Sequence, residues 1–225
     1  MAYSLDFSWL ADAASLILNG ALMTILLVVV SASLGTLISI LGAAGRRSGN
    51  AMLRAAVTSY VELIRNTPFL AQLFFIYFGL PSLGLRLDPV VSAILAMTIN
   101  LAAYGIEIVG AGLDAVARGQ REAGLALGLR PRQIFMKIVL PQALKVIFPA
   151  LTSQIVITML GSAVVSQISV PDLTYAASYI QSRNFRAFET CFFITAAYLL
   201  MALVLRTLLN AAGKRFLSNG RSAAR

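Results

Sequence analysis

Long stretches without a charged residue alternate with short charged segments along this chain. The uncharged stretches cover residues 13–45, 66–85, 89–106, 146–171 and 190–205. A helix needs about 20 mostly apolar residues to cross a bilayer, with a range of about 17–25. The first four stretches reach this range, and the fifth reaches it with its interfacial ends, where an Arg side chain can extend to the headgroups. The pattern predicts an all-α membrane protein of one domain, residues 1–225, with five transmembrane helices over 16–44, 53–81, 89–117, 143–168 and 187–210.

The second of these helices has an amphipathic entry at residues 53–65. Polar and apolar residues segregate there with helical spacing, and Glu62 and Arg65 lie one turn apart, where they can pair. Pro68 predicts a kink just before the span. One interpretation is a helix that lies at the membrane interface. The other is a hinge at the cytosolic gate, with the candidates Glu62, Arg65, Pro68 and Gln72.

The basic residues are distributed unequally between the two ends of the predicted helices. The chain has 18 Lys and Arg against 9 Asp and Glu, a net charge of +9. Such an excess also occurs in nucleic-acid-binding proteins, but here the basic residues separate long apolar runs, and we expect no nucleic-acid partner. Fifteen of them fall on one side of the membrane, and only Arg86, Arg183 and Arg186 fall on the other. Because basic loops stay in the cytosol, we expect the N-terminus outside and the C-terminus in the cytosol.

The composition excludes an ordinary soluble enzyme. Apolar residues make up 59% of the chain and charged residues 12%, with a mean hydropathy of +0.83, whereas globular domains have about 25% charged residues. The chain has no His, which removes the commonest metal ligand and general base. Its single cysteine, Cys191, excludes an internal disulfide or a Cys-based zinc site. We therefore expect neither a metal site nor an intramembrane enzyme.

The connection at residues 114–145 is too long for a passive turn, because helix connections usually take about 2–8 residues. Good helix formers occupy 121–127, Gly128 stands where a glycine often ends a helix, and Pro131 follows it. An apolar stripe at helical spacing then predicts a second short helix, which Pro141 is expected to end. These two helices on the cytosolic face are either a handle for a soluble partner or a hairpin on the membrane surface.

This segment resembles the EAA motif of the permease subunits of bacterial ABC importers, Glu-Ala-Ala-x3-Gly-x9-Ile-x-Leu-Pro. The motif positions are occupied here by Glu122, Ala123, Gly124, Gly128, Ile138 and Pro141. The spacing is complete, and the one departure is Gly124 in place of the second Ala. Further segments are similar to the polar amino acid subgroup of these permeases, at residues 62–74, 103–108, 119–120, 141–143 and 166–173. The resemblance covers roughly residues 16–212.

The resemblance implies the type I ABC importer permease fold in the bacterial inner membrane, with a periplasmic N-terminus and cytosolic coupling helices at 118–141. It implies a subunit that moves a polar amino acid or an amino-acid derivative into the cytosol. The implied partners are a second permease subunit, two cytosolic ATPase subunits and a periplasmic amino-acid-binding protein. The ATPase subunits would bind ATP and Mg²⁺, because this chain has no Walker A loop, and we expect it to bind no cofactor itself. The alternative is a stand-alone carrier or channel for small polar solutes, which leaves the EAA segment unexplained.

Two sets of polar residues lie inside the predicted spans at helical spacing. They are Asn100, Tyr104 and Glu107 in the third span, and Gln154, Thr158 and Ser162 in the fourth. A polar face in an apolar span points at a cavity or at a neighbouring helix. Glu107 is accordingly expected either to line the route and meet the substrate ammonium group, or to bond to another helix. The hydroxyl groups of the fourth span either line the route or bond back to their own helix.

Two intramembrane charges that are common in the subgroup are missing here. The chain has Leu160–Ala163 where the subgroup often carries Lys-Asp-Thr-Ser, and it has Gly110 where an Arg commonly occurs. We therefore expect the partner permease to be a paralogue that supplies polar contacts, rather than an identical copy.

Several charged residues outside the spans are also candidates for contacts with partners. By the resemblance, Glu122 couples the chain to an ATPase, although a carboxylate near a helix start also suits a capping role. Arg183, Arg186 and Glu189 either dock the binding protein or mark a charged helix entrance. The tail residues expected to contact anionic lipid are Lys214, Arg215, Arg221 and Arg225.

Overall fold

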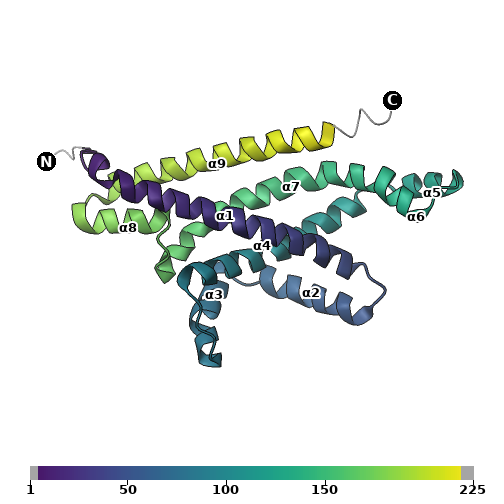
Figure 1. Ribbon diagram of the computed structural model, residues 1–225, viewed down its shortest axis with the longest axis horizontal. Coiled ribbons are helices and arrows are strands. Elements are labelled where there is room, and N and C mark those ends of the chain that lie inside the picture. The colour runs from purple at the N-terminus through teal and green to yellow at the C-terminus, as the bar shows by residue number, and fades with distance from the viewer. Residues whose placement is uncertain (1–4, 219–225) are drawn as a thin grey trace.

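The computed structural model describes residues 5–218, and within that range the chain is helical apart from short connections (Figure 1). The long helices are α1 (Leu10–Arg46), α4 (Pro89–Asp114), α7 (Leu140–Gly161) and α9 (Ala187–Ser218). The shorter ones are α2 (Ala51–Arg65), α3 (Phe69–Phe74), α5 (Arg118–Ala126), α6 (Pro131–Ile134) and α8 (Leu173–Asn184). The π-helical segments are η1 (Phe75–Gly79) and η3 (Phe135–Val139), and the 3₁₀ helices are η2 (Leu80–Leu83) and η4 (Ser162–Ile168). The expected all-helical class is confirmed for the described residues.

The long helices form a bundle, and shorter helices lie at its two ends. α1 packs against α4, α4 against α7, and α7 against α9. α5 and α6 lie at one end of the molecule, whereas α8 and the start of α1 lie at the other (Figure 1). Within residues 5–218, four helical segments are long and apolar enough to cross a membrane, and the bent pair formed by α2 and Phe69–Leu83 also is when it is counted as one span. Counted in this way, the segments match the five spans expected from the charge pattern.

Small residues let α1 and α4 approach each other closely. A side-chain carbon added at Gly35 would lie 2.5 Å from a methyl carbon of Leu101, and one added at Gly105 would collide with Ser39. Ser39 is fully buried, and its hydroxyl lies 2.7 Å from the carbonyl oxygen of Gly35 and 3.3 Å from that of Ala102. Close packing of small residues and hydrogen bonds of this kind hold helices together where lipid removes the hydrophobic driving force between them.

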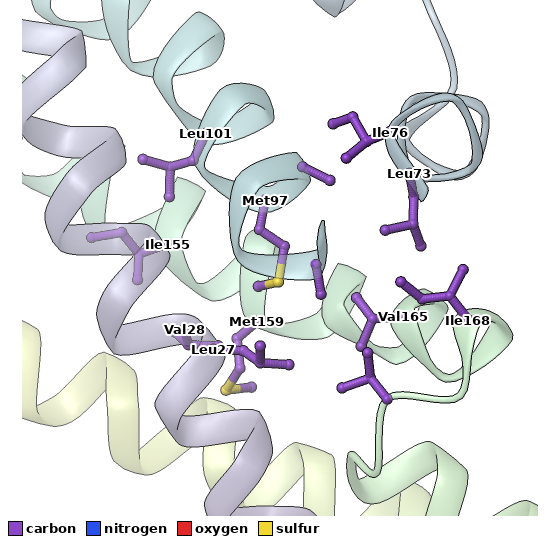
Figure 2. Packing of buried hydrophobic residues seen from close by; sticks show 13 residues of the cluster. Leu27, Val28, Leu73, Ile76, Met97, Leu101, Ile155, Met159, Val165 and Ile168 are labelled. Carbon is purple, nitrogen blue, oxygen red and sulfur yellow. The ribbon is translucent and has the colours of Figure 1, made fainter. Parts of the chain in front are cut away.

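The main apolar core lies where α1, α4 and α7 meet the helical turns of α3, η1 and η4. Its labelled members are Leu27, Val28, Leu73, Ile76, Met97, Leu101, Ile155, Met159, Val165 and Ile168 (Figure 2). A second buried cluster contains Val109, Ile134, Val139 and Ile147. Many other large apolar side chains are exposed, among them Leu41 at 63% and Leu200 at 64%. Such surfaces are unusual on a soluble monomer, but they suit helices that face lipid.

The second expected span is sharply bent. α2 ends at Arg65, and Phe69–Leu83 continues at 109° to it. The bend falls at residues 66–68, where Pro68 has extended backbone angles and directly precedes α3 as its N-cap residue. A proline disfavours the helical conformation of the residue before it and has no N–H to donate. The kink expected at Pro68 is therefore present.

The expectation that Pro141 ends the second coupling helix is wrong. Helical turns continue from Pro131 through α6, η3 and α7 to Ile168. Pro141 lies in the first turn of α7, directly after the π-helical segment η3. A π-helical segment shifts the hydrogen-bond register of the helix, so the missing proline N–H is accommodated there. The second coupling helix is consequently a direct extension of the fourth span.

One helix, α8, is not predicted by the charge pattern. It begins after Asp172, whose Oδ1 accepts the N–H of Tyr175 at 2.8 Å, as an N-cap residue does. The N–H of Leu173 donates to the hydroxyl of Thr24 in α1 at 3.2 Å. A side-chain carbon added at Gly20 would lie 2.8 Å from the carbonyl oxygen of Asp172. The start of α8 is therefore held tightly against α1.

Candidate functional site

A cavity of about 400 Å³ lies between the break after α2, the middle of α4 and the end of α7. Sites for small molecules typically measure about 300–1,000 Å³. The lining residues are Thr67, Pro68, Phe69, Met97, Asn100, Tyr104, Gln154, Ile157, Thr158 and Gly161, all of them uncharged. Four pathway candidates, from α4 and α7, thus meet at one cavity together with the gate candidate Pro68. Glu107 and Ser162 are not among the lining residues.

Gln72 holds the break in place and connects it to α4. Its side chain is 8% exposed, and Nε2 donates to the carbonyl oxygens of Ile64 at 2.7 Å and of Thr67 at 3.1 Å. The same Nε2 lies 2.9 Å from the hydroxyl of Thr67. Oε1 accepts from Nδ2 of Asn100 at 3.0 Å. The gate candidate Gln72 and the pathway candidate Asn100 are therefore one hydrogen-bonded unit.

Of the three polar candidates in the fourth span, Gln154 and Thr158 line the cavity, whereas Ser162, which follows Gly161, does not. Thr158 is 9% exposed, its hydroxyl donates to the carbonyl oxygen of Gln154 at 3.0 Å, and both residues line the cavity. Ser162 is fully buried, and its hydroxyl donates to the carbonyl oxygen of Met159 at 2.7 Å. A step of four residues keeps one face only in a continuous α-helix, and the chain tightens to 3₁₀ after Gly161. Ser162 therefore leaves the face that Gln154 and Thr158 share.

Glu107 lies in a cluster of ion pairs. Its carboxylate pairs with the guanidinium of Arg46 at the end of α1, and with Nη1 of Arg65 at the end of α2 at 3.6 Å. The Arg65 guanidinium also lies 5.4 Å from the centre of the Tyr104 ring. Two cations from two other helices thus share this carboxylate. Of the two interpretations of Glu107, the structure favours bonding to neighbouring helices.

Arg47 makes a second contact between the end of α1 and α4. Its Nη2 donates to the carbonyl oxygen of Gly110 at 2.8 Å and pairs with the carboxylate of Asp114 at 2.7 Å. A side-chain carbon added at Gly110 would make an ordinary van der Waals contact of 3.5 Å with this guanidinium. A cation from α1 thus lies beside the position where an Arg of α4 is expected in the subgroup.

Glu62 and Arg65 do not form the pair that their spacing allows. Arg65 turns to Glu107, whereas the Glu62 carboxylate accepts from the side-chain amide of Asn66 at 3.1 Å. The same amide donates to the carbonyl oxygen of Glu62 at 2.8 Å and so caps the end of α2. Among the four gate candidates, Arg65 and Gln72 therefore tie the break to α4, and Glu62 stabilises the end of α2.

The coupling segment protrudes at one end of the molecule, where α5 and α6 lie beyond the other helices (Figure 1). Glu122 and Ala123 are exposed. Within the described part of the chain, the Glu122 carboxylate has no ion pair and no hydrogen bond. It lies in the second turn of α5 and caps nothing. The carboxylate is therefore available to a partner.

Two glycines shape the turn between the coupling helices. A carbon added at Gly124 would lie 2.9 Å from Cγ1 of Ile134 and 3.2 Å from Cδ1 of Ile138. Gly124 thus lets α5 pack closely on the apolar stripe of the second helix. Gly128 has a φ of +72°, a conformation that side chains disfavour, and the N–H of Leu129 donates to the carbonyl oxygen of Gly124 at 3.1 Å. The departure from the EAA motif therefore has a packing role.

A buried polar cluster surrounds Asp172 at the opposite end of the molecule. The side chain is fully buried, and its Oδ2 accepts from the hydroxyl of Tyr198 in α9 at 3.2 Å. That hydroxyl also forms a hydrogen bond of 2.9 Å with Thr174. Burial raises the pKa of the Asp172 carboxyl to about 6, against hydrogen bonds, chiefly from Tyr175, that lower it. Sequence reasoning missed this residue, although an Asp just after Pro171 and before helix-compatible residues is an N-cap signal.

The charged residues near the start of α9 contact one another. Arg186 pairs with Asp6 at 3.3 Å and with Glu189 at 3.0 Å, and Glu189 is fully buried. The Arg183 guanidinium lies 4.6 Å from the centre of the Tyr179 ring. This arrangement favours a charged helix entrance over a docking role for Arg186 and Glu189. Of the four tail residues expected to contact lipid, Arg221 and Arg225 lie outside the described residues.

The apolar side of the cavity was not predictable from the sequence. Phe69, Met97, Ile157 and Gly161 carry no signal that separates them from other residues of their spans, and Thr67 enters the cavity only because the chain bends at Pro68. Within residues 5–218, no group of three His, Cys, Asp or Glu side chains is placed to hold a metal ion.

Comparison with known proteins agrees with this architecture. Residues 35–218 match the model of a family described as binding-protein-dependent transport system inner membrane component. The chain is 34% identical over 215 residues to the glutamine transport system permease protein GlnP of Escherichia coli strain K12, across 94% of this chain and 98% of that protein. It is 32% identical over 217 residues to the arginine transport system permease protein ArtQ of Bacillus subtilis strain 168, across 96% of this chain and 99% of that protein.

Solved structures give the same result. A crystal structure of an amino acid ABC transporter with histidines contains a chain that is 35% identical, with a TM-score of 0.88 over 95% of this chain and 100% of that one. The MetNI methionine ABC transporter in an inward-facing conformation, 23% identical, shares the fold with a TM-score of 0.68 over 92% of this chain and 97% of that one. The resemblance to ABC importer permeases and their fold is thereby confirmed. The chain belongs to the family of binding-protein-dependent transport system inner membrane components, and it is a multi-pass transport subunit of the bacterial inner membrane.

Proposed function

We propose that this chain forms one half of the pathway through which an ABC importer moves a polar amino acid or an amino-acid derivative into the cytosol. The observation that carries the proposal is the cavity of about 400 Å³, where uncharged polar side chains of α4 and α7 gather within an otherwise apolar bundle. A lining of this kind offers hydrogen bonds to a small polar solute. The relatives also support an amino acid substrate, because three of them are named as permeases for glutamine, arginine and cystine.

The second half of the pathway is supplied by a paralogous permease rather than by an identical copy. A zwitterionic amino acid carries two charges, and each is costly to remove from water without a partner. This chain lines its cavity with uncharged residues only, and its nearby acid Glu107 is shared between Arg46 and Arg65. Two identical halves would leave both substrate charges uncompensated. A paralogue whose half of the pathway carries charged residues would supply partners for the charged groups of the substrate.

Cytosolic ATPase subunits, which bind ATP and Mg²⁺, drive the conformational changes of this chain. The exposed α5 with its unpaired Glu122 is the surface that they grip, and an Arg side chain or backbone amide of the ATPase is the expected partner of this carboxylate. Because α6, η3 and α7 are continuous, a displacement of the coupling helices reaches Gln154 and Thr158 at the cavity. A periplasmic binding protein delivers the substrate to the opposite end.

ATP hydrolysis by the reconstituted complex tests this proposal. The complex contains this chain, the partner permease, the ATPase and the binding protein, with glutamine, arginine, cystine and histidine offered in turn. We expect at least one amino acid to stimulate hydrolysis, and Glu122→Arg to reduce the stimulated rate at least about tenfold, because a charge-assisted contact is replaced by repulsion.

The matched control is Asp12→Arg, the same charge reversal at an exposed residue in the first turn of α1, far from the coupling helices. It should leave the stimulated rate within about twofold of wild type, as surface substitutions usually do. Transport by the purified chain without any ATPase would overturn the proposal and favour a stand-alone carrier.

A further inference from the structure

We infer that Gln72 orients the amide of Asn100 so that its Oδ1 faces the cavity, where it accepts a hydrogen bond from the ammonium group of the transported amino acid. This inference rests on the proposed function, because it concerns how the same cavity distinguishes the two ends of its substrate. It assigns to Gln72 a positioning role and to Asn100 a substrate contact.

The direction of the Gln72 amide is fixed by its neighbours. Three oxygens surround one end of the amide within 2.7–3.1 Å, and two of them are the backbone carbonyl oxygens of Ile64 and Thr67. A carbonyl oxygen can only accept, so the donor Nε2 must lie at this end. Oε1 consequently faces Asn100, and a reversed amide would place an acceptor against two acceptors. With the side chain 8% exposed, water is not available to relieve that repulsion.

The direction of Gln72 in turn decides the direction of Asn100. Because Oε1 of Gln72 can only accept, Asn100 presents Nδ2 to it, at 3.0 Å. Within residues 5–218, Oδ1 of Asn100 accepts no hydrogen bond, and Asn100 lines the cavity. An unconstrained Asn can offer either end of its amide to a ligand, but this one is held with its acceptor free.

Thr158 adds a second acceptor from the opposite helix. Its hydroxyl hydrogen is used by the carbonyl oxygen of Gln154 at 3.0 Å, so only the oxygen lone pairs remain for a ligand. Asn100 and Thr158 come from α4 and α7 and line the same cavity. Acceptors on two walls suit an ammonium group, which has three donors and no acceptor, and they do not suit a carboxylate, which only accepts. The substrate carboxylate therefore needs donors other than Asn100 and Thr158.

Binding of chemically blocked substrates tests this assignment. The complex of this chain, the partner permease and the ATPase is placed in lipid nanodiscs without binding protein. The probes are L-glutamine and L-arginine, their N-acetyl derivatives, in which the ammonium group is lost, and their carboxyl amides, in which the carboxylate is lost. We expect N-acetylation to weaken binding to the wild type at least about tenfold, as expected for the loss of charge-assisted hydrogen bonds.

Asn100→Leu and Gln72→Met should each reduce the N-acetylation penalty to below about threefold, while the penalty for the carboxyl amide stays unchanged. A variant that merely damages the fold lowers the affinity for all three probes in parallel, so the two penalties separate positioning from damage. Thr158→Val tests the second acceptor independently and should also reduce the N-acetylation penalty, whereas Thr158→Ser, which keeps the hydroxyl, should preserve it.

An N-acetylation penalty that stays the same in Asn100→Leu, Gln72→Met and Thr158→Val would overturn the inference and leave the proposed function intact. A larger effect of these variants on the carboxyl-amide penalty would overturn it as well, because it would place the substrate carboxylate at this wall. If the assembled wild-type complex binds none of glutamine, arginine, cystine and histidine, the proposed function fails, and the inference fails with it.

Discussion

At the scale of single residues, the neighbours of a polar group decide its role. Glu107 and Asn100 lie two turns apart on α4, on the face that their spacing predicts for a substrate route. Asn100 reaches the cavity, but Glu107 is drawn into ion pairs with Arg46 and Arg65. Each ion pair links α4 to the end of another helix. Glu107 therefore links α4 to the ends of α1 and α2, and we place it outside the binding site.

Because Glu107 does not line the cavity, we expect its substitution to affect the turnover of the complex more than the affinity for the transported amino acid. We expect Glu107→Gln to leave the affinity for the transported amino acid within about twofold of wild type. The turnover of the complex should change by about two- to fivefold, because pairs that are one-third exposed contribute only about 0.5–1 kcal/mol. Substrate binding without binding protein and single-turnover transport measure the two quantities separately.

Asp114→Asn is the control. Asp114 lies on α4, as Glu107 does, and its carboxylate pairs with Arg47 of α1, but its side chain is 72% exposed. This substitution should have a smaller effect on turnover. A tenfold loss of affinity in Glu107→Gln with unchanged turnover would instead place Glu107 in contact with the substrate.

Helical spacing alone accounts for the polar positions that share the cavity. Asn100 and Tyr104 meet Gln154 and Thr158 because each pair lies on one face of an unbroken helix. Ser162 continues the same numerical step, but the backbone changes to 3₁₀ after Gly161. The hydrogen bonds of Gln72 join residues from both sides of a bend, and no spacing rule describes them.

At the scale of elements, the connections carry more structure than the charge pattern suggests. α6, η3 and α7 are continuous, so the second coupling helix and the fourth span belong to one helical segment, Pro131–Ile168. At the other end, the start of α8 is held by hydrogen bonds from two other helices. Thr24 of α1 and Tyr198 of α9 both bond to the first residues of α8 around the buried Asp172. These contacts join residues far apart in the sequence, which is why local patterns did not reveal them.

Burial of Asp172 gives the molecule a predictable pH dependence. The folded-state pKa of about 6 lies above the ordinary value of 3.8, so between these values the folded state binds more protons than the unfolded state. The free energy of unfolding therefore falls as pH rises from about 4 to about 6, on the order of 2–3 kcal/mol in total. We expect Asp172→Asn, which keeps an acceptor for Tyr175, to remove this fall and to be more stable than wild type at pH 7.5.

Thermal unfolding of the purified complex between pH 4.5 and pH 8 measures this effect. Wild type and Asp172→Asn should unfold at similar temperatures at the acid end and diverge as pH rises. Asp88→Asn is the matched control, because Asp88 caps α4 in the same way but is exposed to solvent. Parallel profiles of wild type and Asp172→Asn over the whole range would show that the buried carboxyl does not titrate there.

At the scale of the whole molecule, the two ends differ in charge and in chemistry. The end with α5 and α6 holds Arg118, Arg121, Arg130 and Arg132, and the exposed Glu122 lies among them. At the end with α8, Arg186 is neutralised by Asp6 and Glu189. The cavity lies between these ends. From this asymmetry we predict that the end with α5 and α6 lies in the cytosol and that the two ends contact different partners.

The orientation is testable with single cysteines. In a Cys191→Ser background, which removes the only native cysteine, Ser182→Cys marks exposed α8 and Ala126→Cys marks exposed α5. Because basic segments stay in the cytosol, a membrane-impermeant maleimide added to intact spheroplasts should label position 182 and spare position 126, and permeabilised membranes should label both.

Moving a basic residue outward against the membrane potential costs about 2.3 kcal/mol per 100 mV. With the basic residues divided 15 to 3, an inverted molecule is strongly disfavoured. Labelling of position 126 alone in intact spheroplasts would reverse the orientation and detach the coupling helices from any cytosolic ATPase.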